Sequence, residues 1–205
     1  MSATSERDAV KVLVRRDPEK ALAMASQIVD PWFRCQALAF VARTIKDLKK
    51  RNKVLKEAFG SASDLTEPNR AVTVSAWPLR VLADHREEVW VEREVKRLLQ
   101  VISQESHPTR RGDGLVGLIH ALHRGPKPTL MKVVEQFKVT CQQGHGWKRD
   151  QNLYEVAILI KKHDPAKSKE LLDLIEDAGK KRNVPNRFDK ENDEQYGARI
   201  DLRFS

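Results

Sequence analysis

The chain has 205 residues, of which 40% are hydrophobic, and 38 Lys and Arg against 29 Asp and Glu give it a net charge of +9. This apolar content excludes a chain that is disordered throughout, and no run approaches the roughly 18 consecutive apolar residues of a membrane-spanning helix. Nine glycines, nine prolines and few aromatic residues favour helices with solvated faces over a sheet protein.

Acid–proline pairs divide the sequence into predicted helices. An acidic residue before proline suits a helix start, because the carboxylate accepts free N–H groups of the first turn and proline gives up only a donor that had no partner. Such pairs occur at Asp17-Pro18, Asp30-Pro31, Glu67-Pro68 and Asp164-Pro165, with His107-Pro108 and Gly125-Pro126 as variants. Between these marks, apolar residues at helical spacing predict helices at about 5–15, 18–29, 31–47, 50–63, 67–84, 86–105, 108–123, 127–142, 147–163 and 165–181.

Two places depart from this pattern. Pro78 lies inside the predicted helix 67–84 and removes a backbone hydrogen bond, so this helix is expected to kink there or to begin late. Residues 183–205 lack helical periodicity and are rich in Asn, Asp, Glu and Arg. The sequence therefore predicts a helical-repeat domain over 1–182 and, over 183–205, a segment that caps the last repeat or is a flexible tail.

One motif recurs along the chain. It begins with an arginine, has a small or medium residue three positions later, and has apolar residues four, seven and usually eight positions later. The steps between Arg34, Arg70, Arg111 and Arg149 are 36, 41 and 38 residues. A repeat of this length is typical of helical solenoids, in which one helix pair buries its apolar face only by stacking on its neighbours. We therefore predict an all-α fold, a right-handed α/α superhelix of about five antiparallel helix pairs.

The segment DPWFRCQALAFVA, residues 30–42, resembles the α/α-superhelical repeats of HEAT and tetratricopeptide proteins. The resemblance covers roughly residues 17–181 at the level of period and pattern. The spacing straddles both classes, and the Trp/Leu-Gly/Tyr signature of tetratricopeptide repeats is absent. What the resemblance implies is a curved binding scaffold rather than a particular chemistry.

Two interpretations of the recurrent arginines stay open. Each arginine precedes the apolar stripe of its helix by one turn, where its guanidinium meets the C-terminal carbonyls of the preceding helix and the negative end of that helix dipole. In the other interpretation, the cations form a ladder that binds phosphates or carboxylates, with aromatic rings beside it. The ladder consists of Arg34, Arg70, Arg110, Arg111, Lys148 and Arg149, with Trp32 and Trp147.

Further positive charge gathers in two clusters. The first contains Lys46, Lys49, Lys50, Arg51, Lys53 and Lys56, and the second contains Lys161, Lys162, Lys167, Lys169, Lys180, Lys181 and Arg182. Such charge attracts nucleic acids, acidic peptides or anionic membrane surfaces without choosing among them, and it also keeps a solenoid soluble.

Three sets of residues resemble chemical motifs, but their predicted structural surroundings do not suit the chemistry. Gly112-x-Gly114-x-x-Gly117 matches a dinucleotide fingerprint in letters, but no strand precedes it, and Gly114, Gly117 and Ala121 are expected to let a neighbouring helix approach. The set His120, His123, Cys141 and His145 would have to bridge about 22 Å along one helix to hold zinc. Asp84-His85 and His163-Asp164 fall at predicted helix ends without a nucleophile beside them. We therefore predict no catalytic residues, metal site or cofactor.

Two functions from different classes follow. The first is a non-enzymatic interaction or scaffold module that binds a protein partner through the solenoid surface. The second is a nucleic-acid-binding solenoid, similar to the HEAT-like alkylpurine DNA glycosylases, to which no catalytic position can be matched. A continuous positive inner wall would favour nucleic acid, whereas a mixed inner wall would favour a protein partner.

The sequence also gives an expected location. The first eight residues are polar and mixed in charge, unlike a secretion signal. The two cysteines, Cys35 and Cys141, give no disulfide framework, which suits a reducing compartment. We expect a cytoplasmic protein.

Overall fold

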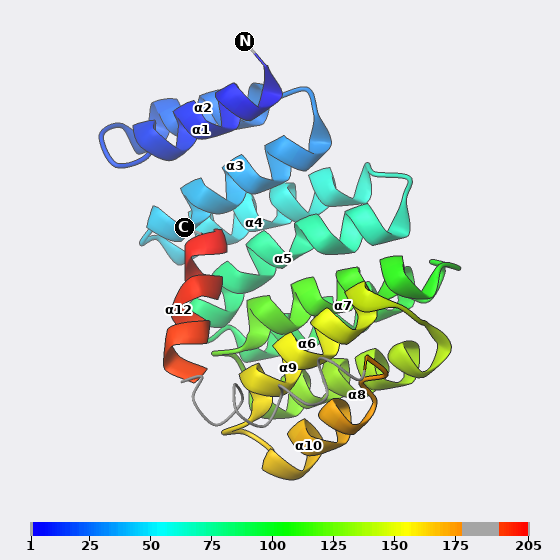
Figure 1. Cartoon of the computed structure of the whole chain (residues 1–205). Coiled ribbons are helices and arrows are strands. Elements are labelled where there is room, and N and C mark those ends of the chain that lie inside the picture. Colours follow the sequence, from blue (N-terminus) through cyan, green and yellow to red (C-terminus); the bar gives the residue numbers. More distant parts are fainter. Residues whose placement is uncertain (1, 178–192, 205) are drawn as a thin grey trace.

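The computed structural model describes residues 2–177 and 193–204 of the chain, and these residues are all-helical with no β-strand (Figure 1). Its helices are α1 (Ala3–Leu13), α2 (Pro18–Gln27), α3 (Pro31–Thr44), α4 (Leu48–Ser63), α5 (Pro68–Asp84), α6 (Glu88–Ile102), α7 (Pro108–Leu122), α8 (Lys127–Gln143), α9 (Trp147–Ile160), α10 (Pro165–Asp173) and α12 (Asp193–Phe204). The first nine predicted helices agree with α1 to α9 to within three residues at either end. The predicted helix 165–181 ends earlier, at Asp173, and the predicted boundary after residue 182 lies outside the described residues.

The acid–proline pairs begin helices for the expected physical reason. An oxygen of Asp30 accepts the backbone N–H of Trp32 at 2.8 Å, and Asp17 and Asp164 each accept an N–H three residues later, at 3.0 and 2.9 Å. Glu67 also precedes a helix but makes no side-chain cap. A carboxylate on the shorter aspartate side chain can reach the free donors of the first turn, and this satisfies groups that the helix itself cannot.

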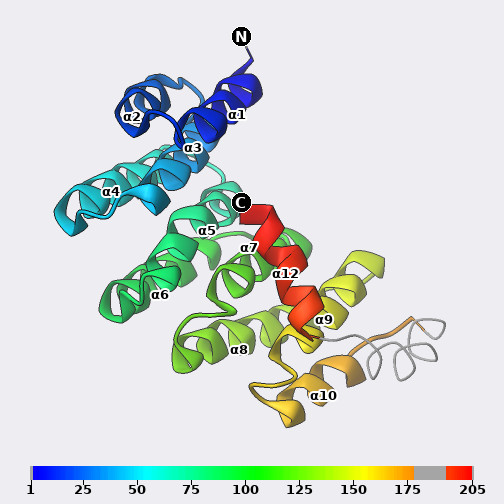
Figure 2. The same ribbon diagram turned by 90° about the vertical axis from the view of Figure 1, so that its left-hand side faces the viewer.

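The helices form two rows. The odd-numbered helices α1 to α9 stack on one another, most extensively α5 on α7, whereas the even-numbered helices α2 to α10 mainly contact their odd-numbered neighbours. Because the odd row packs more closely, the stack curves toward it, and Figure 2 shows the odd row on the inner side of the curve. Five sequential pairs are therefore present, and the right-handedness of the superhelix stays a prediction.

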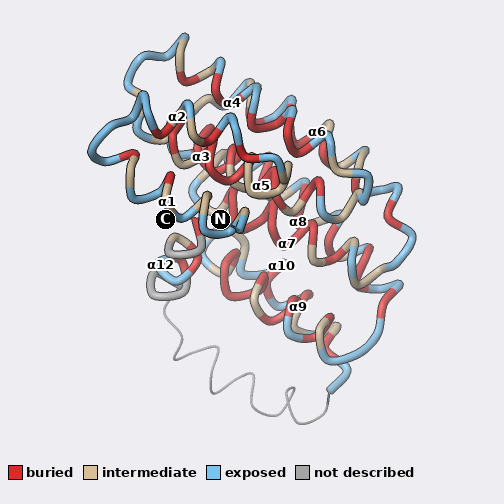
Figure 3. Tube along the Cα trace, turned by 90° about the horizontal axis from the view of Figure 1, so that it is seen from above, coloured by how far each residue is buried: buried red, intermediate tan, exposed pale blue. Residues whose placement is uncertain are grey.

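The core lies between the two rows and between successive odd-numbered helices. Buried residues follow the facing sides of the helices in Figure 3, while exposed residues gather at loops and on outer sides. The apolar stripe of the recurrent motif is inside: Leu38, Leu115 and Leu153 are all buried. Stacking thus buries the face that a single pair would leave in water.

Pro78 does not interrupt α5, which runs unbroken from Pro68 to Asp84, so the expectation that this helix begins late is wrong. Proline lacks the N–H that would bond to the carbonyl four residues earlier, which is that of Val74. The buried thiol of Cys35 on α3 lies 3.5 Å from this carbonyl oxygen and donates to it. Burial also raises the pKa of Cys35, which keeps it a protonated donor. A neighbouring helix therefore supplies the donor that Pro78 removes.

The glycines of α7 allow close packing, as expected. A Cβ on Gly114 would lie 2.7 Å from Cδ1 of the buried Ile102, and one on Gly117 would lie 3.7 Å from the backbone of Thr73 on α5. A Cβ on Gly112 would meet nothing within 4 Å. A Cβ would thus be crowded at the second glycine of the motif, whereas at the third it would make an ordinary van der Waals contact.

This difference gives a matched pair of variants. Gly112→Ala should raise the free energy of unfolding by about 0.5 to 1 kcal/mol, because alanine favours a helix over glycine. Gly114→Ala gains the same preference but must displace Ile102, and it should be less stable than Gly112→Ala by about 1 kcal/mol or more. Urea unfolding of both variants measures the difference, and equal stabilities would contradict the close approach at Gly114.

The C-terminal helix α12 belongs to neither row. It crosses the odd-numbered helices on the inner side, near the C-terminal ends of α3, α5 and α7 (Figure 1). Of the segment predicted as a cap or tail, residues 183–192 lie outside the described residues.

Candidate functional site

A cleft of about 480 Å³ opens on the inner side of the curve, over the N-terminal halves of the odd-numbered helices. We call it the inner cleft. Helices α3, α5, α7 and α9 all contribute to it, and α12 crosses the same helices further toward their C-terminal ends (Figure 1). The cleft is lined by Trp32, Asn69, Arg70, Thr73, Asp113, Val116, Gly117, Lys148, Asn152 and Glu155.

One wall of the inner cleft is a polar ladder between α7 and α9. Asn152 donates from its amide to Asp113 at 2.9 Å, and the ammonium of Lys148 lies 3.9 Å from the same carboxylate oxygen. Further along, Nε2 of the buried His120 lies 3.1 Å from Glu155. Both carboxylates of the cleft therefore have partners within the protein, and this wall carries charges of both signs.

The opposite wall comes from α3 and α5. The guanidinium of Arg70 lies over the ring of Trp32, 5.6 Å from its centre, and Nη1 is 3.5 Å from Glu67. The Trp32 ring also meets Trp77 edge to face, with 6.5 Å between ring centres. Trp77 in turn meets Phe204 of α12 at 5.2 Å. An unbroken line of ring contacts therefore joins the inner cleft to α12.

Three of the four recurrent arginines tie helix ends together. Arg34 donates to the carbonyl of Ile28 at 3.3 Å, Arg111 to that of Glu105 at 2.9 Å and Arg149 to that of Gly144 at 3.1 Å. Each carbonyl lies just after an even-numbered helix, five or six residues before its arginine. This arrangement corresponds to the first interpretation, in which the guanidinium meets carbonyls at the end of the preceding helix.

The same three side chains also reach the end of the next even-numbered helix. Arg34 contacts Asp64 at 2.6 Å after α4, and Arg111 donates to Gln143 at 3.3 Å at the end of α8. Arg149 donates to the carbonyl of Leu174 after α10. Each guanidinium therefore links two successive repeats through their inter-helix turns, a role that the sequence pattern alone did not predict.

The other members of the predicted ladder separate into two groups. Arg70, Lys148 and Trp32 meet in the inner cleft. Arg110 is exposed, and Trp147 at the start of α9 is 71% exposed; neither lines the cleft. The structure thus brings three of the eight predicted residues together and adds polar residues that the arginine pattern did not include, mainly Asn69, Thr73, Asp113, Asn152 and Glu155.

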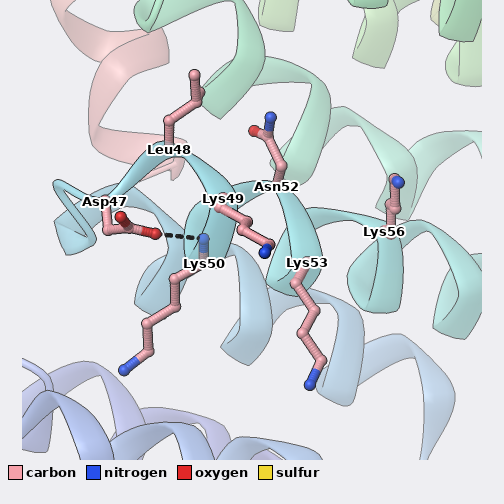
Figure 4. Close-up of a pocket in the computed structure, with 7 residues that line it drawn as sticks. All are labelled: Asp47, Leu48, Lys49, Lys50, Asn52, Lys53 and Lys56. Atoms are coloured by element: carbon pink, nitrogen blue, oxygen red, sulfur yellow. Dashed lines mark hydrogen bonds between the residues drawn. The ribbon is translucent and has the colours of Figure 1, made fainter.

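The first lysine cluster lies on α4, in the outer row. Asp47 caps this helix by accepting the N–H of Lys50 at 2.6 Å, and an open hollow of about 950 Å³ runs along it (Figure 4). We call this surface the lysine face; its residues are Asp47, Leu48, Lys49, Lys50, Asn52, Lys53 and Lys56. Lys50 pairs with Glu19 of α2, whereas the part of the chain that the structure describes holds no ion-pair partner for Lys49, Lys53 or Lys56. Positive charge is therefore denser on the outer side than in the inner cleft.

In the part of the second lysine cluster that the structure describes, more of the positive charge is paired than on the lysine face. Lys167 pairs with Glu135 of α8, and the hydrogen bond between them raises the pKa of Lys167 and lowers that of Glu135. Lys180, Lys181 and Arg182 lie outside the described residues.

Comparisons with known proteins support the fold alone. No protein-family model matches the chain, and the search of curated proteins finds no match. The chain is similar to the crystal structure of Ton1535 from Thermococcus onnurineus NA1, with a TM-score of 0.65 and 17% identity, over 98% of this chain and 57% of that one. The chain thus spans little more than half of that structure's length. Among the described residues, every helix is too short or too polar to cross a bilayer.

Proposed function

We propose that this protein is a non-enzymatic interaction module that binds a segment of a protein partner in the inner cleft. The observation that carries the proposal is the mixed lining of that cleft, where Arg70 on one wall faces Asp113, Lys148 and Glu155 on the other. A polyanion such as nucleic acid would meet two carboxylates there, whereas a peptide carries charges of both signs and can match the pattern.

The uncharged lining supports the same conclusion. Asn69 and Thr73 stand one turn apart on α5 and are half-buried, with 3.3 Å between the Thr73 hydroxyl and the Asn69 side-chain oxygen. Amide and hydroxyl groups both donate and accept, which suits the alternating N–H and C=O groups of an extended peptide. Trp32 adds a rigid aromatic surface, the type of residue on which binding energy tends to concentrate.

One observation favours a second candidate, nucleic-acid binding on the outer side. Lys49, Lys53 and Lys56 recur at three- and four-residue steps and are exposed, so they form one stripe along the solvent side of α4. A stripe of this kind follows a phosphate backbone, and its affinity would fall steeply with salt.

Selection from a phage-displayed library of random peptides tests the proposal and the alternative together. We expect the full chain to select peptides that carry both acidic and basic residues. Their affinity, measured by fluorescence anisotropy, should fall at least tenfold with Arg70→Ala or with Lys148→Ala. The matched variant Lys53→Ala, on the lysine face, should leave peptide affinity unchanged.

A labelled single-stranded oligonucleotide provides the second arm, at about 50 and 200 mM salt. Peptides that bind Arg70→Ala and Lys148→Ala as well as they bind the unaltered chain would refute the inner cleft as the site. Oligonucleotide binding that is tighter than peptide binding and is lost in Lys53→Ala would replace the proposal with the second candidate.

A further inference from the structure

The C-terminal helix α12 lies in a second recessed surface of the odd row, which we call the α12 groove. The groove is formed by Arg43 of α3, Trp77 and Arg80 of α5, and His123 and Arg124 at the end of α7. These residues precede α12 by about 70 residues or more along the sequence. The α12 helix also packs against α9. The helices of the five pairs stack mainly on one another, so α12 lies on a scaffold whose principal contacts are made without it (Figure 2).

A single carboxylate anchors α12 in the groove. Nη2 of Arg80 lies 2.6 Å from Oδ1 of Asp201, Arg124 pairs with Oδ2, and Nε2 of His123 lies 3.4 Å from Oδ1. Arg80 is only 4% exposed, so its charge is costly to bury unless carboxylates face it. Burial lowers the pKa of His123 and the charge of Arg80 lowers it further, so the ring is neutral near pH 7.

The scaffold alone does not balance the charge of the groove. Among the described residues, Asp84 is the scaffold carboxylate that meets these guanidiniums, 2.8 Å from Nε of Arg80 and 4.0 Å from Arg43. Without Asp201, the three arginines Arg43, Arg80 and Arg124 would face Asp84 alone. The groove therefore requires a carboxylate from whatever occupies it.

An aromatic ring one helical turn later completes the recognition. Phe204 is 2% exposed and meets Trp77 edge to face, with 5.2 Å between ring centres. Its carbonyl accepts a hydrogen bond from Nη1 of Arg43 at 2.7 Å. An aspartate and an aromatic residue three positions apart lie on one face of a helix, so α12 presents both anchors at once.

The net free energy that keeps α12 docked in the groove is limited. It is a helix of 12 residues, a length at which isolated helices are marginal in water, so its folding and its docking are coupled. The side chains of Ile200 and Phe204 are buried, while those of Ala198 and Arg199 are exposed. Ordering the helix offsets part of the free energy gained when α12 docks, so the net affinity of α12 for the groove is modest.

We propose that the α12 groove is a binding site for a partner helix that presents an aspartate and, three residues later, an aromatic residue, and that α12 occupies this site as an internal competitor. The groove lies apart from the inner cleft and does not depend on the function proposed for the cleft. A covalently attached ligand acts at an effective concentration on the order of millimolar, so a partner helix must exceed that advantage to displace α12.

A labelled synthetic peptide of residues 193–205 tests the proposal against the full chain. In the variant Asp201→Lys, the new ammonium repels Arg80 and Arg124 and releases α12. We expect the peptide to bind this variant at least tenfold more tightly than it binds the unaltered chain, measured by fluorescence anisotropy. A peptide that itself carries Asp201→Lys should not bind either chain. The milder variant Phe204→Ala provides the same comparison if Asp201→Lys fails to fold.

A second substitution identifies the surface that binds the peptide. Adding Arg124→Glu to the chain released by Phe204→Ala should abolish peptide binding, because Asp201 of the peptide then meets a carboxylate, whereas adding Arg110→Glu, which is exposed outside the groove, should not change it. Equal affinity of the peptide for the released and unaltered chains would overturn the proposal, as would binding that ignores Arg124→Glu. Sedimentation provides a further check: an unaltered chain that is a dimer and becomes a monomer with Asp201→Lys would overturn the proposal, because α12 would then join two copies of this chain.

Discussion

Leu38→Asp should lower the free energy of unfolding by about 3 to 5 kcal/mol, because it places a carboxylate without a partner between stacked helices. Leu38 lies on α3 in the apolar stripe of the recurrent motif and is 0% exposed. Leu153 is its counterpart on α9, and Leu153→Asp should have an effect of similar size. Urea unfolding followed by circular dichroism measures both.

Val89→Asp is the matched control for this prediction. Val89 lies near the start of α6 and is 88% exposed. An aspartate in the first turn also suits the helix dipole, so stability should change by no more than about 0.5 kcal/mol. If Leu38→Asp melts within a degree or two of the unaltered chain, the apolar stripe has been assigned to the wrong side of the helix.

Arg149→Gln should lower the free energy of unfolding by about 2 to 4 kcal/mol, more than the same change at any other recurrent arginine. Arg149 is 6% exposed, donates to the carbonyls of Gly144 and Leu174, and lies 2.6 Å from Glu176. Its Nε is 3.5 Å from Asp150, whose buried carboxylate would lose this neighbouring charge. The variant therefore removes the guanidinium donor from the buried carbonyl of Gly144 and the half-buried carbonyl of Leu174, and the neighbouring charge from buried Asp150.

Arg111 and Arg110 supply a graded comparison. Arg111 is half-buried, with one carbonyl and one amide as partners, and Arg111→Gln should cost about 1 kcal/mol. Arg110 is the exposed neighbour, and Arg110→Gln should stay within about 0.5 kcal/mol of the unaltered chain. Thermal and urea unfolding measure all three. If all three variants are as stable as the unaltered chain but lose peptide or oligonucleotide binding, the result would instead support the binding ladder.

The repeats could be predicted from the sequence because their signals are local. Asp17, Asp30 and Asp164 cap helices within three residues of themselves, and the apolar stripe needs only the helical period to be seen. The role of the recurrent arginines was predictable in part. The carbonyls just before Arg34 and Arg111 are near in sequence, whereas their second contacts, to Asp64 and Gln143, lie about 30 residues away and depend on how the repeats stack.

The inner cleft and α12 could not be predicted in this way. The cleft depends on four helices, and its one local signal is the buried Asn152, a polar residue at a motif position that holds alanine, threonine or glycine in the other repeats. Residues 193–204 carry no acid–proline pair, and Asp201 lies 121 positions after its partner Arg80 in the sequence. Their helix is stabilised by tertiary contacts, which periodicity does not report.

The line of rings from Phe204 through Trp77 to Trp32, with Arg70 over the last ring, is continuous from the α12 groove to the inner cleft, so we expect an occupant of one surface to influence binding at the other. We expect a molecule in the cleft that draws Arg70 away from Trp32 to alter the packing of Trp77, the ring that also contacts Phe204. Coupling of this kind is reciprocal: the factor by which a cleft ligand changes the occupancy of the groove equals the factor by which the groove's occupant changes cleft affinity. We therefore expect the three rings of Phe204, Trp77 and Trp32 to carry any cooperativity between the inner cleft and the α12 groove, without movement of the helices that hold them.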